Sequence, residues 1–512
     1  MIKKASEITL KVRPIALTIE HRYYYEGPCR FGQGEALQPG FDRLLNSQIA
    51  EEFMGYLKSS APAGVELLEL VSIGRTDNWE NKEEMWETVG KAIVDADVVF
   101  FSSFIAVDDI CVEFAQRFRD IPFVISPRAV FSPASISAAV RAKYPEREVY
   151  TPLNWTEAGC LFSALRARKV IRNTNILLAS RFNSDSSYSS VDTFSNHDLV
   201  TEKLGVHFRY VNAHELLDDM YPAAEEGNHT TPGRQTWNIT GEEMAEAEQI
   251  ADELIGQASE CEVAREYVIN SVRAYLVVRK IMDEKDCNGF TVPCPDICST
   301  RRLNEMKFTF CLTHSLNMEN GVPSACEFDA NAVLSQQALI AVSGQMPYMG
   351  NTSPIIFENG EFRPSFGLSD ERFARLRENP ENLYYMQHSV PHRCLKSPNQ
   401  KGSYALRHFA YDGKWGAVMR YDFEQDAGET VTLCRFSPDG GKMLVGRGTI
   451  VGGDGYELNN CNGLVIFRVK DQMDFWTKQN WCGNHIALVY GDYTKELSRL
   501  CSVLRIEELT AY

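Results

Sequence analysis

The sequence predicts an α/β fold: two doubly wound βα sandwich domains followed by a β-rich, barrel-like C-terminal domain with a closing helix. Strand-like and helical segments alternate through the first two thirds of the chain. Apolar runs such as VVFFSSF and PFVIS are typical of parallel strands buried on both faces. Beyond residue 354, short alternating runs punctuated by glycine indicate antiparallel strands. We place the domains at residues 1–168, 169–350 and 351–512.

The first domain alternates strands and helices in order. Strands are expected at 14–19, 65–71, 98–101 and 122–125, and helices at 48–59, 82–96 and 110–118. The loop after the first strand, HRYYYEGPCRFGQGEALQPG, lies where ligands gather in such sheets. Arg30 and the tyrosines at 23 to 25 are therefore candidate ligand contacts, with ordinary aromatic packing as the alternative. GQGEA is not a GxGxxG fingerprint, so no dinucleotide is expected.

The second domain begins near Lys169. Strands are expected at 175–180, 207–212 and 289–294, with a further short strand at 311–313, and helices at 241–259 and 261–285. A central stretch at 320–351 then brings Glu327 and Asp329, within the motif ACEFD, to the start of a helix that ends near Gly344. An acid at a helix N-terminus is stabilised by free backbone amides, so Asp329 either caps this helix or ligates a metal.

The third domain contains candidate strands at 404–423, 429–437, 441–453 and 462–469, and a last helix at 494–504.

Composition excludes several classes of protein. The 512 residues carry a net charge of −17 without a long run of Lys or Arg, which argues against a nucleic-acid surface. We expect no signal peptide and no membrane span, because charges interrupt every apolar run. The 14 cysteines lie mostly in apolar segments, as expected of reduced, buried thiols in the cytoplasm. Cys294 and Cys298 lack a second pair and are only a weak zinc signal.

Four segments hold polar residues next to apolar runs, where a buried polar side chain needs a partner: Glu327 with Asp329, Asn351 after Gly350, His388 with His392, and His485. Carboxylate, amide oxygen and imidazole together suit a divalent cation of the manganese type. A single buried histidine is more often a hydrogen-bonded core residue, so the pattern alone leaves both interpretations open.

Three segments carry a resemblance to a known family. The run NWCGNHIALVYGDYTKELSRLCSVLRIEEL resembles the closing segment of the L-fucose isomerase and L-arabinose isomerase superfamily, ACEFD resembles its ACE-type motif, and GETVTLCRFSPDGGKMLV resembles its C-terminal β-domain. The resemblance implies that Glu327 is a metal ligand and catalytic acid/base, and that His388 and His485 are metal ligands. Asn351 stands where the family has a second metal-binding acid. An amide can offer an oxygen to a metal but cannot act as a general base.

The resemblance implies a Mn²⁺-dependent (or other divalent cation) aldose–ketose isomerase that acts on an unphosphorylated monosaccharide through an enediol. Glu327 would carry the carbon-bound proton, and Asp329 or a metal-bound water the oxygen protons. Arg30, His392 and Trp481 are candidate sugar contacts, although His392 and Trp481 could equally support the site or the core.

Alternatives are an epimerase or other diverged sugar reaction, or a catalytically silent sugar-binding homologue. The family also implies a homo-oligomer, a trimer or hexamer with sites at subunit contacts, and a cytoplasmic location. Lys307, His314 and Glu319 are weaker candidates for facing the substrate, since a surface loop there is as compatible with the sequence.

Overall fold

The computed structural model describes residues 2–20, 33–38, 40–76, 80–102, 109–127, 132–180, 194–222, 237–294, 297, 300–358 and 360–512. The chain forms two compact units. One comprises Ile8–Arg166, and the other comprises Met1–Glu7 with Ala167–Tyr512. The three-domain division at 168/169 and 350/351 stays a prediction.

The unit Ile8–Arg166 is built on one parallel sheet with the order β2-β1-β4-β5-β6, in which β3 extends the β2 edge along β1. This is the order of a doubly wound sheet. The strands are β1 (Leu10–Glu20), β2 (Val65–Leu67), β3 (Val71–Thr76), β4 (Val98–Phe101), β5 (Phe123–Ile125) and β6 (Val149–Tyr150). The helices are α1 (Phe41–Ser60), α2 (Lys82–Ala92), α3 (Asp109–Arg117), α4 (Ser132–Lys143) and α5 (Trp155–Arg172), whose last turns belong to the second unit, with the 3-10 turn η2 (Gly34–Leu37). The 3-10 turn η1 (Ala5–Glu7) belongs to the second unit.

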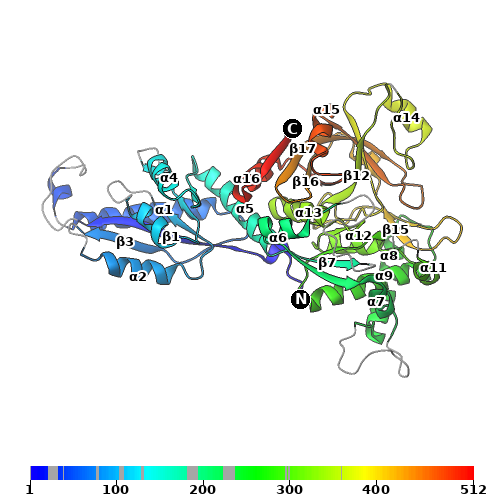
Figure 1. Cartoon of the computed structure of the whole chain (residues 1–512), viewed down its shortest axis with the longest axis horizontal. Helices are drawn as coiled ribbons and strands as arrows, with labels where there is room; N and C mark the ends of the chain where they lie inside the picture. Colours follow the sequence, from blue (N-terminus) through cyan, green and yellow to red (C-terminus); the bar gives the residue numbers. More distant parts are fainter. Residues whose placement is uncertain are drawn as a thin grey trace. The chain divides into compact units, whose positions relative to one another are not determined.

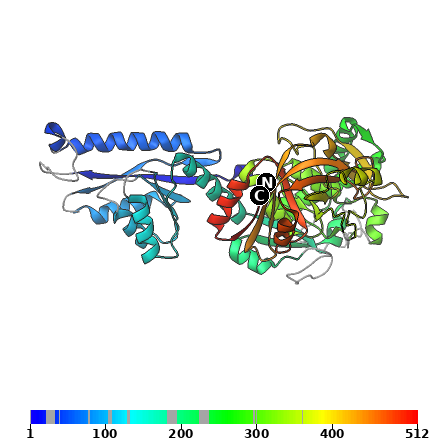
Figure 2. The ribbon, with the colours of Figure 1, turned by 90° about the horizontal axis from the view of Figure 1, so that it is seen from above.

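Helices cover both faces of this sheet (Figures 1 and 2). Successive residues of a strand point to opposite faces. Accordingly, Phe100 of β4 stacks on Phe53 of α1 at 5.5 Å, while Phe101 packs edge-on against Phe114 of α3 at 5.0 Å. The continuously apolar run that predicted a parallel strand is therefore buried from both sides.

The second unit contains a four-stranded parallel sheet with the order β11-β10-β7-β8. Its strands are β7 (Asn175–Ser180), β8 (His207–Asn212), β10 (Gly289–Thr291) and β11 (Ser324–Ala325). Its helices are α6 (His197–Leu204), α7 (Ala213–Asp219), α8 (Gly241–Gln257), α9 (Arg265–Glu284), α11 (Arg301–Met306), α12 (Cys311–Glu319) and α13 (Ala330–Ser343). The predicted strand at 311–313 is wrong, because these residues begin α12. Eight of the nine residues of α12 are buried, which hides the helical period in the sequence.

A closed, six-stranded antiparallel barrel follows, with the order β16-β19-β12-β13-β18-β17 and a further β16–β17 pairing that closes it. The barrel-like C-terminal sheet is thus confirmed (Figure 1). Its strands are β12 (Tyr348–Pro354), β13 (Leu383–Gln387), β16 (Thr430–Phe436), β17 (Lys442–Asp454), β18 (Leu464–Val469) and β19 (His485–Tyr490). Accompanying helices are α14 (Asp370–Leu376), η3 (Phe423–Asp426), α15 (Gln472–Gln479) and α16 (Thr494–Leu504). Helix α16 is not the last element, because β20 (Glu507–Ala511) follows it and pairs in parallel with β17.

The strands predicted at 404–423 exist but lie outside the barrel. They form the hairpin β14 (Ala405–His408) and β15 (Ala417–Arg420), which joins β9 (Glu260–Cys261) in a separate three-stranded sheet. An ion pair ties these segments together: the buried guanidinium of Arg407 lies 2.6 Å from Glu260 and 2.8 Å from Glu457.

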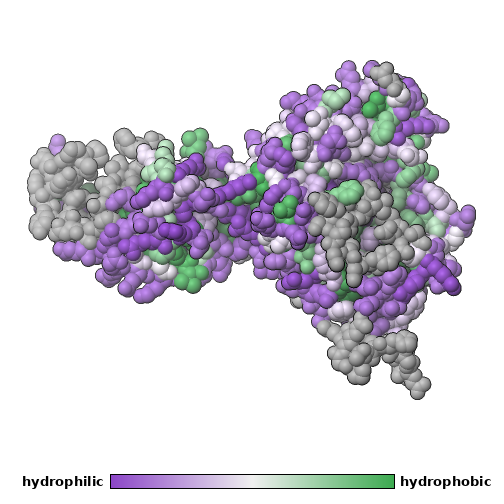
Figure 3. Space-filling view, in the orientation of Figure 1, coloured by the Kyte–Doolittle hydropathy of each residue, from purple (hydrophilic) through white to green (hydrophobic). Residues whose placement is uncertain are grey.

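The face drawn in Figure 3 carries mainly hydrophilic residues with scattered apolar ones. Among the described helices, none has the length and apolar character needed to cross a membrane.

Candidate functional site

Helix α13 connects the parallel sheet to the barrel. It packs against β10 and β11 of the parallel sheet and against β16 and β19 of the barrel. Asp329 is its N-cap, with Oδ1 accepting a hydrogen bond of 2.8 Å from the amide of Ala332, and Gly344 is its C-cap with φ 68°. The capping role of Asp329 and the predicted end of the helix are confirmed.

A tight, strained turn joins β11 to α13. The amide of Asp329 donates to the carbonyl of Cys326 at 3.3 Å, and both central residues, Glu327 (φ 62°) and Phe328 (φ 61°), adopt the left-handed region. Non-glycine residues there cost about 1–3 kcal/mol each and persist only where the surroundings enforce them. The enforcing contacts are the burial of the Phe328 ring and the 3.0 Å hydrogen bond from its amide to Val292. The turn thus presents Glu327 at the carboxyl end of a parallel strand.

Two histidines meet the carboxylate of Glu327. His485 Nε2 lies 3.0 Å from Oε2, and His388 Nε2 lies 3.4 Å from Oε1. Both histidines are buried and the Glu327 side chain is 14% exposed. Burial raises the pKa of Glu327, but the charge of His485 and the hydrogen bond to His388 outweigh it and hold the pKa well below its ordinary value. Three of the predicted metal ligands therefore come together from the β11–α13 turn, the end of β13 and the start of β19.

A buried ion pair fixes the orientation of His485. Its Nδ1 lies 2.9 Å from Oδ2 of Asp329, and the same oxygen accepts from Arg435 at 2.5 Å. Arg435 also donates to the carbonyl of His485 at 2.8 Å. Burial raises the pKa of Asp329, but Arg435 and His485 lower it to about 2. Both carboxylate oxygens are occupied, which favours a positioning role for Asp329 over the predicted handling of substrate protons.

His485 faces Glu327 through its Nε2 atom. Burial lowers the pKa of His485, but Glu327 and Asp329 raise it to about 10, so the ring is an imidazolium at neutral pH. With Nδ1 bonded to Asp329, Nε2 is the atom that a metal would take in place of the proton, and a carboxylate behind the ring is the usual support of a ligating histidine.

His388 is arranged differently from His485. Its Nδ1 accepts a hydrogen bond of 3.0 Å from the amide of Ser389, which places the ring proton on Nε2, facing Glu327. Ligation through Nε2 would require that proton to move to Nδ1 and the bond from Ser389 to be lost. In this tautomer His388 orients the carboxylate of Glu327.

A thiol completes a group that could hold a metal ion. Cys326, Glu327 and His388 each offer a ligand atom, and these atoms lie within 4.8 Å of one another. Sequence reasoning missed Cys326, although it stands within the ACEFD motif itself.

Asn351 lies on β12, directly opposite His485 on β19 and Gln387 on β13. Opposite residues of an antiparallel pair point to the same face of the sheet, so these three side chains share a face. The amide oxygen of Asn351 accepts a hydrogen bond of 2.5 Å from Asn484. The structure thus places Asn351 beside His485, with its oxygen held by an amide donor.

The predicted sugar contacts are less well placed. His392 is fully buried, with Nε2 3.1 Å from the carbonyl of Pro347 and Nδ1 accepting from the amide of Cys394, which fits a supporting role in the core. Trp481 is 59% exposed, so burial in the core does not explain it, and its ring lies 5.1 Å from the ammonium of Lys442. Arg30 and the neighbouring tyrosines lie outside the described residues.

The three weaker candidates for facing the substrate each lie on a helix or at the end of one. Lys307 is the C-cap of α11, in the left-handed region. His314 is buried on α12. Glu319 forms a buried ion pair with Arg393 at 2.7 Å.

No protein-family model and no curated protein sequence matches the chain. Its function is therefore inferred from the motifs and the geometry of the site.

Proposed function

We propose that this chain is a metal-dependent aldose–ketose isomerase of the L-fucose and L-arabinose isomerase type, acting on an unphosphorylated monosaccharide through an enediol. The convergence of Glu327, His388 and His485 on one buried position supports the proposal most strongly, because these are the residues that the resemblance assigns to metal binding and proton transfer. Assembly into a trimer or hexamer and a cytoplasmic location belong to the same proposal.

The donors present fit a divalent cation. Nε2 of His388 and Nε2 of His485 are buried, and both face the carboxylate of Glu327, at 3.4 and 3.0 Å. Glu327, His485 and the amide oxygen of Asn351 would hold the ion, and His388 would join after a change of tautomer. Hard oxygen donors with imidazole favour Mn²⁺. Such an ion, when bound, polarises the substrate oxygens as a Lewis acid.

The residues of the chain itself move and position the proton. Glu327 is ionised and takes the proton from the carbon beside the carbonyl, then returns it to the neighbouring carbon. His388 faces Oε1 of this carboxylate and His485 faces Oε2, so the two histidines position Glu327 for the transfer. Asp329 and Arg435 keep His485 in one orientation throughout.

Deuterium exchange tests this function. Proton NMR of a panel of aldoses and ketoses in D₂O should show uptake of deuterium next to the carbonyl with the Mn²⁺-loaded protein, and none with metal-stripped protein. Mn²⁺ that is not bound to the protein is removed from solution before the spectrum is recorded. Uptake with net formation of ketose supports the isomerase, and uptake without ketose indicates the epimerase. Bound metal with no uptake across the panel would indicate the silent sugar-binding homologue.

Asn351→Asp should increase aldose–ketose turnover about tenfold or more, because it restores a second group that can accept a proton, and a positioned acid/base contributes roughly 10²–10⁴-fold. The amide of Asn484 that donates to Asn351 can donate equally to a carboxylate. Asn484→Asp is the matched control, since it adds the same charge one hydrogen bond away. Equal turnover in Asn351→Asp and the unmodified chain would show that the amide does not limit the reaction.

A further inference from the structure

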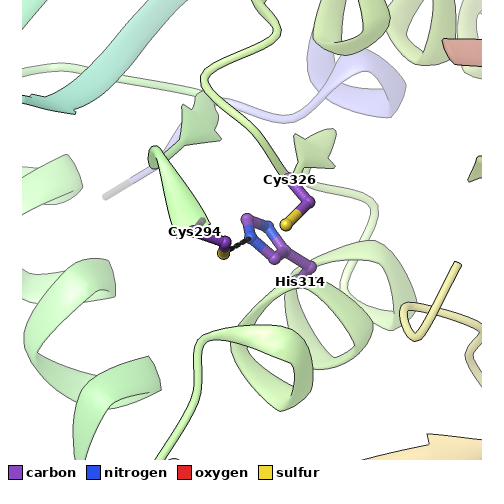
Figure 4. A group of neighbouring side chains, drawn as sticks. All are labelled: Cys294, His314 and Cys326. Carbon is purple, nitrogen blue, oxygen red and sulfur yellow. Dashed lines mark hydrogen bonds between the residues drawn. The ribbon is translucent and has the colours of Figure 1, made fainter. Parts of the chain in front are cut away.

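A second group of potential metal ligands combines Cys326 of the ACEFD motif with two residues from other segments, Cys294 and His314. Cys294 follows β10, Cys326 follows β11, and His314 projects from α12 (Figure 4). Strands β10 and β11 are neighbours in parallel register, with Thr291 opposite Ala325, so their carboxyl ends bring the two thiols together. The two sulfurs and one imidazole nitrogen lie within 4.8 Å of one another, and all three residues are buried.

The imidazole is aimed at the thiols by its other contacts. His314 Nε2 lies 3.9 Å from Cys294 Sγ, while Nδ1 lies 2.8 Å from the hydroxyl of Ser324. The ring stacks on Phe290 with 5.6 Å between ring centres. When Nδ1–H donates to Ser324, the lone pair of Nε2 points toward the sulfurs, as Figure 4 shows for the ring between the two cysteines. An outer hydrogen bond of this kind is what fixes a ligating histidine.

We propose that Cys294, His314 and Cys326 form a zinc site distinct from the site of Glu327, His388 and His485. Two thiolates and one imidazole match borderline-soft Zn²⁺ and disfavour Mn²⁺, which prefers oxygen donors. Binding releases one proton from each thiol and changes no oxidation state, so no oxidant is required. The proposal follows from the donor set alone and does not depend on the isomerase function.

A zinc ion at this site would link three segments of the chain. The ion would link the end of β10, helix α12 and Cys326, which is covalently adjacent to Glu327. Zinc there would therefore hold the strained turn that carries Glu327.

X-ray absorption at the zinc edge tests the site on the full chain. Reduced, metal-stripped protein loaded with one equivalent of Zn²⁺ should show at least two sulfur neighbours at about 2.3 Å, in both the unmodified chain and His485→Gln. A single sulfur would place the ion on Cys326, Glu327 and His388 instead and overturn the proposal. Oxygen and nitrogen neighbours alone, or no retained zinc, would also overturn it. The experiment on the unmodified chain needs no substitution, so it stays decisive if a variant misfolds.

Cys294→Ser should weaken zinc binding at least tenfold in competition with a chromophoric chelator, since even outer partners of a ligand contribute roughly 10–100-fold. Cys434→Ser is the matched control, because Cys434 is equally buried but bonds the carbonyl of Ser335 on α13. Unchanged affinity in a folded Cys294→Ser protein would contradict the assignment.

Discussion

Glu327→Gln should reduce deuterium exchange at the substrate carbon by about 10²–10⁴-fold, because glutamine keeps the shape of the side chain but cannot accept a proton. The loss should persist at saturating Mn²⁺, which separates the missing base from weakened metal binding. Proton NMR in D₂O measures the rate, and circular dichroism checks the fold.

Glu371→Gln is the matched control for Glu327→Gln, since Glu371 is an exposed residue at the start of α14. Its exchange rate should equal that of the unmodified chain. Exchange by Glu327→Gln within threefold of the unmodified rate would remove Glu327 from the proton transfer.

Arg435→Met should lower the free energy of unfolding by up to about 3–5 kcal/mol, the usual cost of breaking a buried ion pair, because His485 alone then compensates the charge of Asp329. Asp329 is fully buried. Its carboxylate contacts Arg435 at 2.5 Å and His485 at 2.9 Å. Urea unfolding of the full chain measures the change. Adding Asp329→Asn to Arg435→Met should recover part of the loss, because it removes the buried charge.

Arg447→Met supplies the comparison for Arg435→Met. Arg447 forms an ion pair with Asp492 at 2.9 Å, but the two side chains are 48% and 41% exposed. Water and salt screen such a pair, so its loss should cost less than about 1 kcal/mol. A similar small cost for Arg435→Met would show that the buried pair does not hold the site together.

Features with local causes were predictable from the sequence. Asp329 before an apolar run and Gly344 after it predict a helix, because capping depends on the nearest backbone groups. Continuous apolar runs predict parallel strands for the same kind of reason. The short buried helix α12 was missed since burial on every side leaves no periodicity to detect, and β20 was missed because its partner β17 is far along the chain.

Contacts between distant segments could not be predicted in the same way. Arg435 lies 106 residues after Asp329, and only its position inside an apolar strand signals that it needs a partner. The sequence places Cys294 near Cys298, whereas the structure brings it next to His314, 20 residues later. The grouping of Glu327, His388 and His485 is predicted only by the family resemblance, because the resemblance assigns residues that are far apart in the sequence to one site.

The separation of Asp329 and His485 along the sequence has a consequence during protein synthesis. His485 leaves the ribosome 156 residues after Asp329, a delay of roughly 8–30 s at about 5–20 residues per second. Through that interval α13 can form, but its N-cap carboxylate has neither the imidazolium nor the guanidinium that it contacts in the finished molecule. The contacts of Asp329 with Arg435 and His485 can therefore form only after β16 and β19 have been synthesised.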